Sequence, residues 1–186
     1  MGNSYMAEIE FTKYKKHGPY HWRQYVSGSK YKVHADYIKK WVREKKVLDV
    51  GAGDGLITYL VGAKGIDNEP VACDLARTLG VEVMYGNAYD LTKHYGKFDA
   101  VLMADVLEHY DNPERALAEA AKVAPVLYIT TPERGMVNDP FHVQEWTRDE
   151  LPVFMQQNNW KLDGLIKVSK HTKSMYGRFI YTLSNT

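Results

Sequence analysis

Two acidic residues and a histidine follow one another at helical spacing in Asp105-Val106-Leu107-Glu108-His109. If this segment turns as a helix, positions i, i+3 and i+4 bring Asp105, Glu108 and His109 to one side. A second histidine, His142, stands in a predicted loop further along the chain. Two carboxylates and two imidazoles suit a divalent metal ion with open positions for a substrate. Glu108 and His109 also suit catalysis without a metal, since a weakly acidic hydroxyl needs a general base.

A glycine-rich turn lies upstream, in Val47-Leu48-Asp49-Val50-Gly51-Ala52-Gly53-Asp54-Gly55. A buried strand is predicted to end there and to run directly into a helix over residues 56–61. Glycines at positions 51, 53 and 55 allow a sharp bend and let a ligand approach the backbone closely. Because open α/β sheets bind ligands at this end of a parallel strand, the turn predicts a ligand site.

The charges around this turn indicate which ligand it binds. A dinucleotide fingerprint has its third glycine where this chain has Leu56, and the carboxylates of Asp49 and Asp54 would repel a pyrophosphate. S-adenosylmethionine has no phosphate and carries an ammonium and a sulfonium group, so it suits nearby carboxylates. Its ribose diol needs an acceptor, and Asp67, 18 residues after Asp49 at the end of a short strand, is the predicted one. Asp74 competes for this role but falls within the next predicted helix.

Several motifs together carry a family resemblance: the glycine-rich turn, Gly65-Ile66-Asp67, Gly86-Asn87-Ala88, residues 98–102 and residues 105–109. From about residue 46 to 183 the chain resembles the class I S-adenosylmethionine-dependent methyltransferases. The resemblance implies that Asn87 and Ala88 contact the adenine and that Ala104 and Asp105 line the methionine end of the cofactor. Many members have Asp in place of Asn87, whose amide still hydrogen-bonds a base. The complete predicted cofactor set is Asp49, Gly51, Ala52, Gly53, Gly55, Asp67, Asn87, Ala88, Ala104 and Asp105.

Residues 105–109 also resemble the metal-dependent O-methyltransferases, which include small-RNA 3′-terminal 2′-O-methyltransferases and quinone-biosynthesis enzymes. These carry an acid-x-x-Glu-His motif here, and in the RNA enzymes a Glu-Trp-Thr-Arg-like stretch soon follows a later ligand histidine, as it follows His142 in this chain. The resemblance implies Asp105, Glu108, His109 and His142 as ligands of Mg²⁺ or another divalent ion. Asp105 stands where those families usually have Glu and is shorter by one methylene. Metal-free class I enzymes share Asp-x-Leu-Glu-His, so His109 as a base, a substrate contact or a packing residue stays open.

Residues 1–46 are basic and aromatic, with 11 Lys and Arg against 4 Asp and Glu, whereas the rest of the chain has 13 against 19. Such a segment suits a phosphorylated or nucleic-acid substrate, but amphipathic helices that cover the core and expose their lysines are the favoured explanation. We expect residues 1–45 to form a helical cap and residues 46–186 the cofactor-binding core of a single domain. In the cap, His21 and Tyr25 are expected either to reach the methionine carboxylate or substrate, or to pack among aromatic rings.

Short apolar runs alternate with segments of helical spacing, which favours a doubly wound, Rossmann-like α/β sheet with helices on both faces. The runs cover residues 47–50, 81–85, 98–104, 125–130, 162–168 and 178–183. Asn112-Pro113-Glu114 predicts a helix start, and Thr147-Arg148-Asp149-Glu150 is a capping box for a helix through residue 158. About nine residues separate the last two strands, too few for a crossover helix, so these strands are predicted to pair antiparallel. The family resemblance implies the same arrangement: seven strands with an antiparallel C-terminal hairpin.

Composition excludes several classes of protein. The single cysteine, Cys73, excludes an internal disulfide, the longest apolar run of about seven residues is too short for a membrane span, and no signal pattern opens the sequence. A cytoplasmic location is therefore expected.

We predict methyl transfer from S-adenosylmethionine to a hydroxyl oxygen of a small molecule, a sugar or an RNA end. The alternatives are a nicotinamide-dependent oxidoreductase and a non-catalytic module that docks RNA on a cofactor fold.

Overall fold

The computed structural model describes residues 13–93 and 96–182. Two predictions extend beyond these residues: the first twelve residues of the expected cap and Leu183 at the end of the last expected strand. The helices are α1 (Lys13–His17), α2 (Tyr20–Val26), α3 (Lys30–Trp41), α4 (Leu56–Val61), α5 (Pro70–Thr78), α6 (Pro113–Val123) and α7 (Glu150–Gln157), with short 3₁₀ turns η1 (Leu91–Lys93) and η2 (Leu107–His109). The strands are β1 (Val47–Val50), β2 (Lys64–Asp67), β3 (Val83–Tyr85), β4 (Ala100–Ala104), β5 (Val126–Pro132), β6 (Trp160–Leu162), β7 (Lys167–Val168) and β8 (Ser174–Tyr181).

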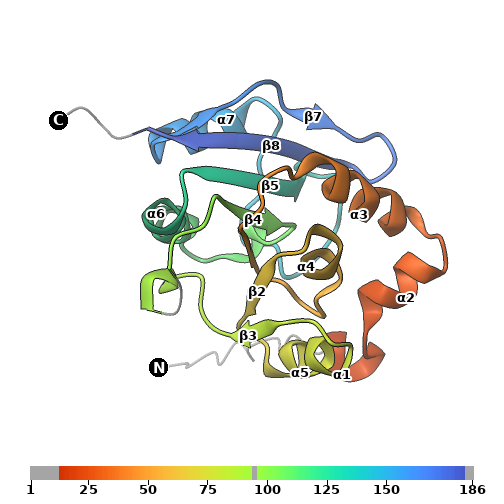
Figure 1. Cartoon of the computed structure of the whole chain (residues 1–186). Helices are drawn as coiled ribbons and strands as arrows, with labels where there is room; N and C mark the ends of the chain where they lie inside the picture. Colours follow the sequence, from red (N-terminus) through yellow and green to blue (C-terminus); the bar gives the residue numbers. More distant parts are fainter. Residues whose placement is uncertain (1–12, 94–95, 183–186) are drawn as a thin grey trace, which may run out of the picture.

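The strands form one sheet in the order β3-β2-β1-β4-β5-β8-β6 (Figure 1). The first five strands in this order pair in parallel, and β8 pairs antiparallel with β5 and β6. The predicted mostly parallel sheet with an antiparallel C-terminal hairpin is confirmed. The predicted strand over residues 162–168 is instead two strands, because Gly164 has a left-handed φ of 104° that interrupts extended backbone. Its second part, β7, is an additional two-residue strand beside β8.

Helices cover both faces of this sheet, as predicted. Alternate residues of β4 point to opposite faces. Val101 and Met103 pack in a core with α6 and α7, whereas Ala100 and Leu102 pack in another with α3 and α4. In Figure 1, α6 lies on one side of the strands and α3 and α4 on the other. The sheet is therefore the middle layer of three.

The helix-start signals act as predicted. The Asn112 side chain accepts a hydrogen bond from the backbone N of Arg115 at 3.0 Å and begins α6. At α7, the backbone N of Thr147 donates to Glu150 Oε2 at 2.9 Å while the backbone N of Glu150 donates to Thr147 Oγ1 at 3.3 Å. This reciprocal pair is the expected capping box.

Strands β1, β2, β4 and β5 run parallel, so their carboxyl ends lie at the same edge of the sheet. This edge carries Asp49, Asp67, Ala104 and Pro132. β8 runs the opposite way and starts at this edge, where its Tyr176 pairs with Thr130 of β5. The helices α1 and α2 precede the core, and Figure 1 shows α1 beside α5. This edge of the sheet and the helices next to it position the candidate site.

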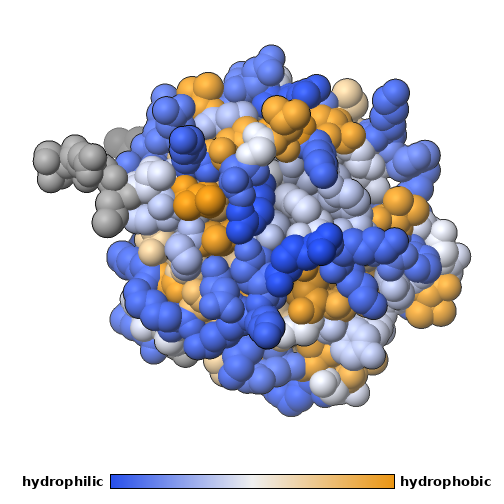
Figure 2. Space-filling model, turned by 45° about the horizontal axis from the view of Figure 1, so that its top comes forward, coloured by the Kyte–Doolittle hydropathy of each residue, from blue (hydrophilic) through white to orange (hydrophobic). Residues whose placement is uncertain are grey.

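In residues 13–93 and 96–182, no helix has both the length and the apolar character that a membrane crossing requires. On the face drawn in Figure 2, hydrophilic side chains cover most of the surface and hydrophobic ones gather in separate small groups.

Candidate cofactor and acceptor site

The glycine-rich turn joins β1 to α4 at the edge just described. Gly51 and Gly53 have φ values of 77° and 57°, in the left-handed region. A Cβ at Gly51 would lie 2.0 Å from Val106 Cγ2, so only glycine lets the turn approach the loop after β4 this closely. The backbone N atoms of Gly51 and Ala52 both donate to the carbonyl of Ile66 at 2.9 Å, which fixes the turn against β2.

Asp67 ends β2 directly beside this turn. Its Oδ2 accepts a hydrogen bond from the backbone N of Gly53 at 2.7 Å, and its Oδ1 accepts one from the backbone N of Glu69 at 2.8 Å. Burial raises the pKa of Asp67, and the two backbone hydrogen bonds oppose this shift without cancelling it. Each oxygen of a carboxylate has a second lone pair, so the group retains capacity for two ligand hydroxyls.

The two other acids of the turn have protein partners. Asp49 is buried and its Oδ2 accepts a hydrogen bond from Thr58 Oγ1 at 2.7 Å; burial raises its pKa to about 7. Asp54 is also buried, and its carboxylate accepts hydrogen bonds from the backbone N of His21 at 2.8 Å and from the His21 ring at 3.2 Å. Asp49 anchors α4 and Asp54 anchors α2. Their predicted place beside a cationic ligand group stays a prediction.

Aromatic residues of the first helices cover the turn. A Cβ built on Gly53 would lie 2.1 Å from the hydroxyl oxygen of Tyr14, which is itself buried. The His21 ring lies between those of Tyr14 and Tyr31, at centroid distances of 6.0 and 4.8 Å. The second residue predicted to reach the ligand or to pack among aromatic rings, Tyr25, donates to Asp36 on α3 at 2.8 Å. His21 thus reaches the cofactor turn, and Tyr25 holds α2 against α3.

The residues expected at the adenine lie in the loop after β3. Asn87 Oδ1 accepts a hydrogen bond from the backbone N of Tyr89 at 2.9 Å, and Ala88 is buried. Ala104 ends β4 on the other side of the turn. The expected contacts therefore lie at the carboxyl ends of β1 to β4, in one row along the sheet edge.

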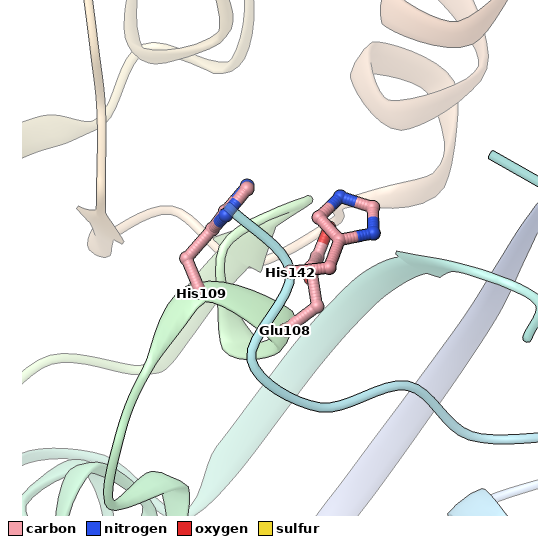
Figure 3. Close-up of side chains that lie close together, drawn as sticks. All are labelled: Glu108, His109 and His142. Atoms are coloured by element: carbon pink, nitrogen blue, oxygen red, sulfur yellow. The ribbon is translucent and has the colours of Figure 1, made fainter. Parts of the chain in front are cut away.

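Glu108, His109 and His142 come together next to this row (Figure 3). One ligand atom from each lies within 4.8 Å of the others. Nδ1 of His109 lies 3.0 Å from the carbonyl oxygen of Phe141, and Nδ1 of His142 lies 2.6 Å from Glu145 Oε1. Because both partners are acceptors, each Nδ1 is the donor in its hydrogen bond, and Nε2 is the ring nitrogen that remains for another contact.

The carboxylate of Glu108 lies beside these imidazoles and is fully buried. Within the described part of the chain, neither of its oxygens has a hydrogen-bond partner. Burial, and then the charge of Asp105, raise the pKa of Glu108 well above its ordinary value. Burial lowers the pKa of His109, although its bond to Phe141 opposes the change. Both groups therefore favour their neutral forms in the absence of a cation. A buried carboxyl group without hydrogen-bond partners, next to two imidazoles, matches the donor set of a divalent cation.

Asp105, the fourth predicted ligand, lies outside this group. Its φ of 52° turns the chain, and its backbone N donates to the carbonyl of Thr130 at 2.9 Å. Its Oδ1 accepts from Thr130 Oγ1 at 2.8 Å, and its Oδ2 lies 3.2 Å from His34 Nε2. The segment is a helical turn only over 107–109, and Asp105 does not join the ligand group of Glu108, His109 and His142. Sequence patterns gave no signal for His34, which is contributed by α3.

A polar pocket of about 530 Å³ adjoins the group. His142 and Glu145 form part of its wall, together with Arg134, Asn138, Asp139 and Gln144. Arg134 is held there by Glu150 at 2.8 Å and by the carbonyl of Glu145. The loop between β5 and α7 thus supplies both His142 and a space large enough for a small acceptor.

Comparison with known proteins agrees with this geometry. Residues 48–125 match the family model described as Methyltransferase domain. The ribosomal protein L11 methyltransferase of Prochlorococcus marinus (strain AS9601) is 28% identical over 127 residues, covering 64% of this chain and 41% of that protein. The ubiquinone biosynthesis O-methyltransferase of Azoarcus sp. (strain BH72) is 34% identical over 106 residues, covering 49% of this chain and 46% of that protein. The crystal structure of magnesium protoporphyrin IX methyltransferase from Synechocystis PCC 6803 with bound S-adenosylhomocysteine has a TM-score of 0.69 at 14% identity, covering 91% and 97% of the two chains.

The match of residues 48–125 and these relatives support the prediction that this chain is one of the class I S-adenosylmethionine-dependent methyltransferases. Its described sheet has their fold, and its glycine-rich turn falls within the matched residues. The chain spans less than half the length of the two curated relatives. The match to a methyltransferase family model and to methyltransferase relatives disfavours the alternative prediction, a nicotinamide-dependent oxidoreductase.

Proposed function

We propose that this protein transfers a methyl group from S-adenosylmethionine to a hydroxyl oxygen. The hydrogen bond of 2.7 Å between the backbone N of Gly53 and Asp67 Oδ2 carries the cofactor part of the proposal. This bond holds the Asp67 carboxylate against the glycine-rich turn, which supports its role as the acceptor of the ribose diol. The turn, Asp67, Asn87 and Ala88 then share the nucleoside, and Ala104 and Asp105 face its amino-acid end.

Calorimetric titration with S-adenosylhomocysteine tests cofactor binding directly. Asp67→Asn keeps the size of the side chain but removes the charge that accepts both ribose hydroxyls, so we expect affinity to fall at least tenfold. Asp74→Asn is the matched control, because Asp74 was the competing ribose acceptor and lies exposed on α5, paired with Arg77. Absence of heat with the unaltered protein, or an equal loss in both variants, would rule out this assignment.

The acceptor is proposed to be deprotonated by His109. Its Nδ1 proton is held by the carbonyl of Phe141, so Nε2 is the free base, and the lowered pKa keeps the ring neutral near pH 7. S-adenosylmethionine supplies a methyl group already activated by its sulfonium. The protein then has to hold the acceptor oxygen in line with that methyl, a positioning effect worth about 7–11 kcal/mol in well-oriented systems. A small molecule, a sugar and an RNA end all present the required hydroxyl.

A divalent cation such as Mg²⁺ is proposed at Glu108, His109 and His142. The buried carboxyl group of Glu108 and one ring nitrogen from each histidine lie close enough together to bind such an ion. The ion would act as a Lewis acid and lower the pKa of the acceptor hydroxyl. Asp105 is left out of the proposed ligand set because Thr130 and His34 already bind its carboxylate. If the ion is bound, His109 is a ligand and not the base.

Metal binding is tested with Mn²⁺ as a spectroscopic probe for Mg²⁺. We expect one tight Mn²⁺ per chain by electron paramagnetic resonance, and a loss of at least tenfold in affinity for Glu108→Gln. Glu114→Gln, an exposed acid at the start of α6, is the control and is expected to bind like the unaltered protein. Equal Mn²⁺ binding by both variants would contradict the site, and His109 as general base would then stand alone.

A further inference from the structure

In residues 13–93 and 96–182, the buried side-chain nitrogen and oxygen atoms that lack a hydrogen-bond partner belong to two residues. They are the two carboxyl oxygens of Glu108 and the hydroxyl oxygen of Thr131. Both residues are fully buried. A buried polar atom without a partner costs free energy, so each such atom in a folded protein calls for an explanation, such as a bound ion.

The hydroxyl of Thr131 lies next to the carboxyl group of Glu108. Thr131 pairs with Met175 of β8, so the two side chains lie on the same face of the sheet. Met175 packs in one core with Leu107 of η2, and Thr131 therefore faces the side on which η2 lies. The Thr131 hydroxyl is close enough to Glu108 to lower its pKa, against the larger effect of burial. The unpartnered atoms of the two residues are thus neighbours.

The backbone of Glu108 holds the loop that carries His142 (Figure 3). Its carbonyl oxygen accepts hydrogen bonds from the backbone N of Val143 at 2.9 Å and from that of Gln144 at 3.2 Å. The loop is therefore fixed on η2 through the main chain of one of the candidate ligands. The side chain of Glu108 has no such restraint from a hydrogen bond, so its own rotation is the freedom that a neighbouring group has to limit.

We propose that Thr131 is the positioning residue of the cation site: its hydroxyl donates to one carboxyl oxygen of Glu108 and leaves the other oxygen for the cation. This inference rests on the proposed function, because it concerns the cation proposed there at Glu108, His109 and His142. One hydrogen bond and one ion then account for all three unpartnered atoms. Groups that hydrogen-bond to a metal-binding carboxylate orient it, and their loss commonly lowers metal affinity by about 10- to 100-fold.

Two substitutions of Thr131 test the hydroxyl. Thr131→Val keeps the shape of the side chain without the hydroxyl, and its affinity for Mn²⁺ is expected to fall about tenfold or more by electron paramagnetic resonance. Thr131→Ser keeps the hydroxyl and is expected to bind Mn²⁺ within about threefold of the unaltered protein. The spectrum of the bound Mn²⁺ should change in Thr131→Val, because the carboxylate is free to rotate, and should be retained in Thr131→Ser.

Thermal unfolding of the metal-free proteins separates this role from a structural one. Without a cation the Thr131 hydroxyl has no partner, so Thr131→Val is expected to unfold at the same temperature as the unaltered protein or at a higher one. A hydroxyl that only stabilises the fold would instead lower the unfolding temperature of Thr131→Val and leave its Mn²⁺ affinity unchanged.

Thr130→Val is the matched control, since it makes the same change at the neighbouring, equally buried position. Thr130 Oγ1 donates to Asp105 Oδ1 at 2.8 Å, and Asp105 lies outside the proposed ligand set. The Mn²⁺ affinity of Thr130→Val is therefore expected to change by less than about twofold, although its unfolding temperature should fall because a buried hydrogen bond is lost.

The outcomes distinguish this inference from the proposed function. If the unaltered protein binds no Mn²⁺, the cation part of the proposed function fails and this assignment fails with it. If the unaltered protein binds Mn²⁺ and Thr131→Val binds it equally well, or Thr131→Ser loses as much affinity as Thr131→Val, the positioning role alone is overturned. An equal loss in Thr130→Val and Thr131→Val would also overturn it, because the effect would then belong to the end of β5 as a whole.

Discussion

At the scale of single residues, the site contains acids that the fold keeps from water. Asp49 is the clearest case, because its one hydrogen bond, from Thr58, does not offset burial and its pKa rises to about 7. In the unfolded chain an aspartate titrates near 3.9. The folded protein therefore binds the Asp49 proton more tightly than the unfolded chain does. Stability from this group is complete below pH 4 and is lost as the pH rises to 7.

Asp49→Asn is expected to remove this loss, since an asparagine oxygen still accepts from Thr58 and carries no charge. The unfolding free energy of the variant, relative to that of the unaltered protein, should rise by roughly 3 kcal/mol between pH 4.5 and pH 8. Urea unfolding at the two pH values measures it, without cofactor. Asp111→Asn, an exposed acid, should show no such change. An unchanged difference between the two pH values would mean that Asp49 titrates normally.

At the scale of elements, α2 is fastened to the cofactor turn through one carboxylate. Asp54 accepts from the backbone and ring of His21, and the indole of Trp22 donates to the Asp54 carbonyl at 2.8 Å. Asp54→Ala removes the first two bonds and leaves the third. We expect α2 to open more often, so that trypsin cleaves after the exposed Arg23 about tenfold faster. Cleavage in α6 should stay unchanged, which shows that the core is folded, and Asp74→Ala serves as the control. Equal cleavage rates at Arg23 would show that Asp54 does not hold α2.

The start of α7 sets the end of the loop that carries His142. Thr147→Ala breaks the capping box and is expected to cost about 1 kcal/mol of unfolding free energy. Thr147→Ser keeps the hydroxyl and should recover most of this stability. Thermal unfolding of the three proteins measures the effect, and a loss of equal size in both variants would assign it to the threonine methyl group rather than to the cap.

At the scale of the whole molecule, local signals predicted much of the fold and only part of the site. The glycine turn, the strand ending at Asp67 and both helix caps depend on neighbours a few residues away, and the structure agrees with them. His34 and Tyr176 are hydrogen-bonded although they lie 142 positions apart in the sequence. Hydrophobic periodicity does not predict such a contact. The prediction that Asp105 joins Glu108 and His109 on one side of a helical turn missed a contact of the same kind. Asp105 has a positive φ, and both its backbone N and its carboxylate are hydrogen-bonded to Thr130 on the neighbouring strand. The roles of the predicted site residues stay predictions.

The same scale shows how the cofactor turn is covered. Tyr14 of α1 lies against Gly53, at the backbone that a nucleoside has to approach, and Trp22 and His21 hold the next helix over Asp54. If the cofactor binds at this turn, we expect α1 to move first. The fraction of molecules with α1 displaced then limits the rate of association.

Tyr14→Ala is expected to remove this barrier. Stopped-flow measurement of tryptophan fluorescence, with Trp22 beside the turn, should show S-adenosylhomocysteine associating about tenfold faster than with the unaltered protein. Dissociation should also be faster, because the ring that covers the bound ligand is absent. Val26→Ala, which alters an exposed position at the end of α2, is the control and should leave both rates unchanged. If Tyr14→Ala speeds dissociation alone, Tyr14 contacts the bound ligand without obstructing its entry, and the movement of α1 is not the limiting step.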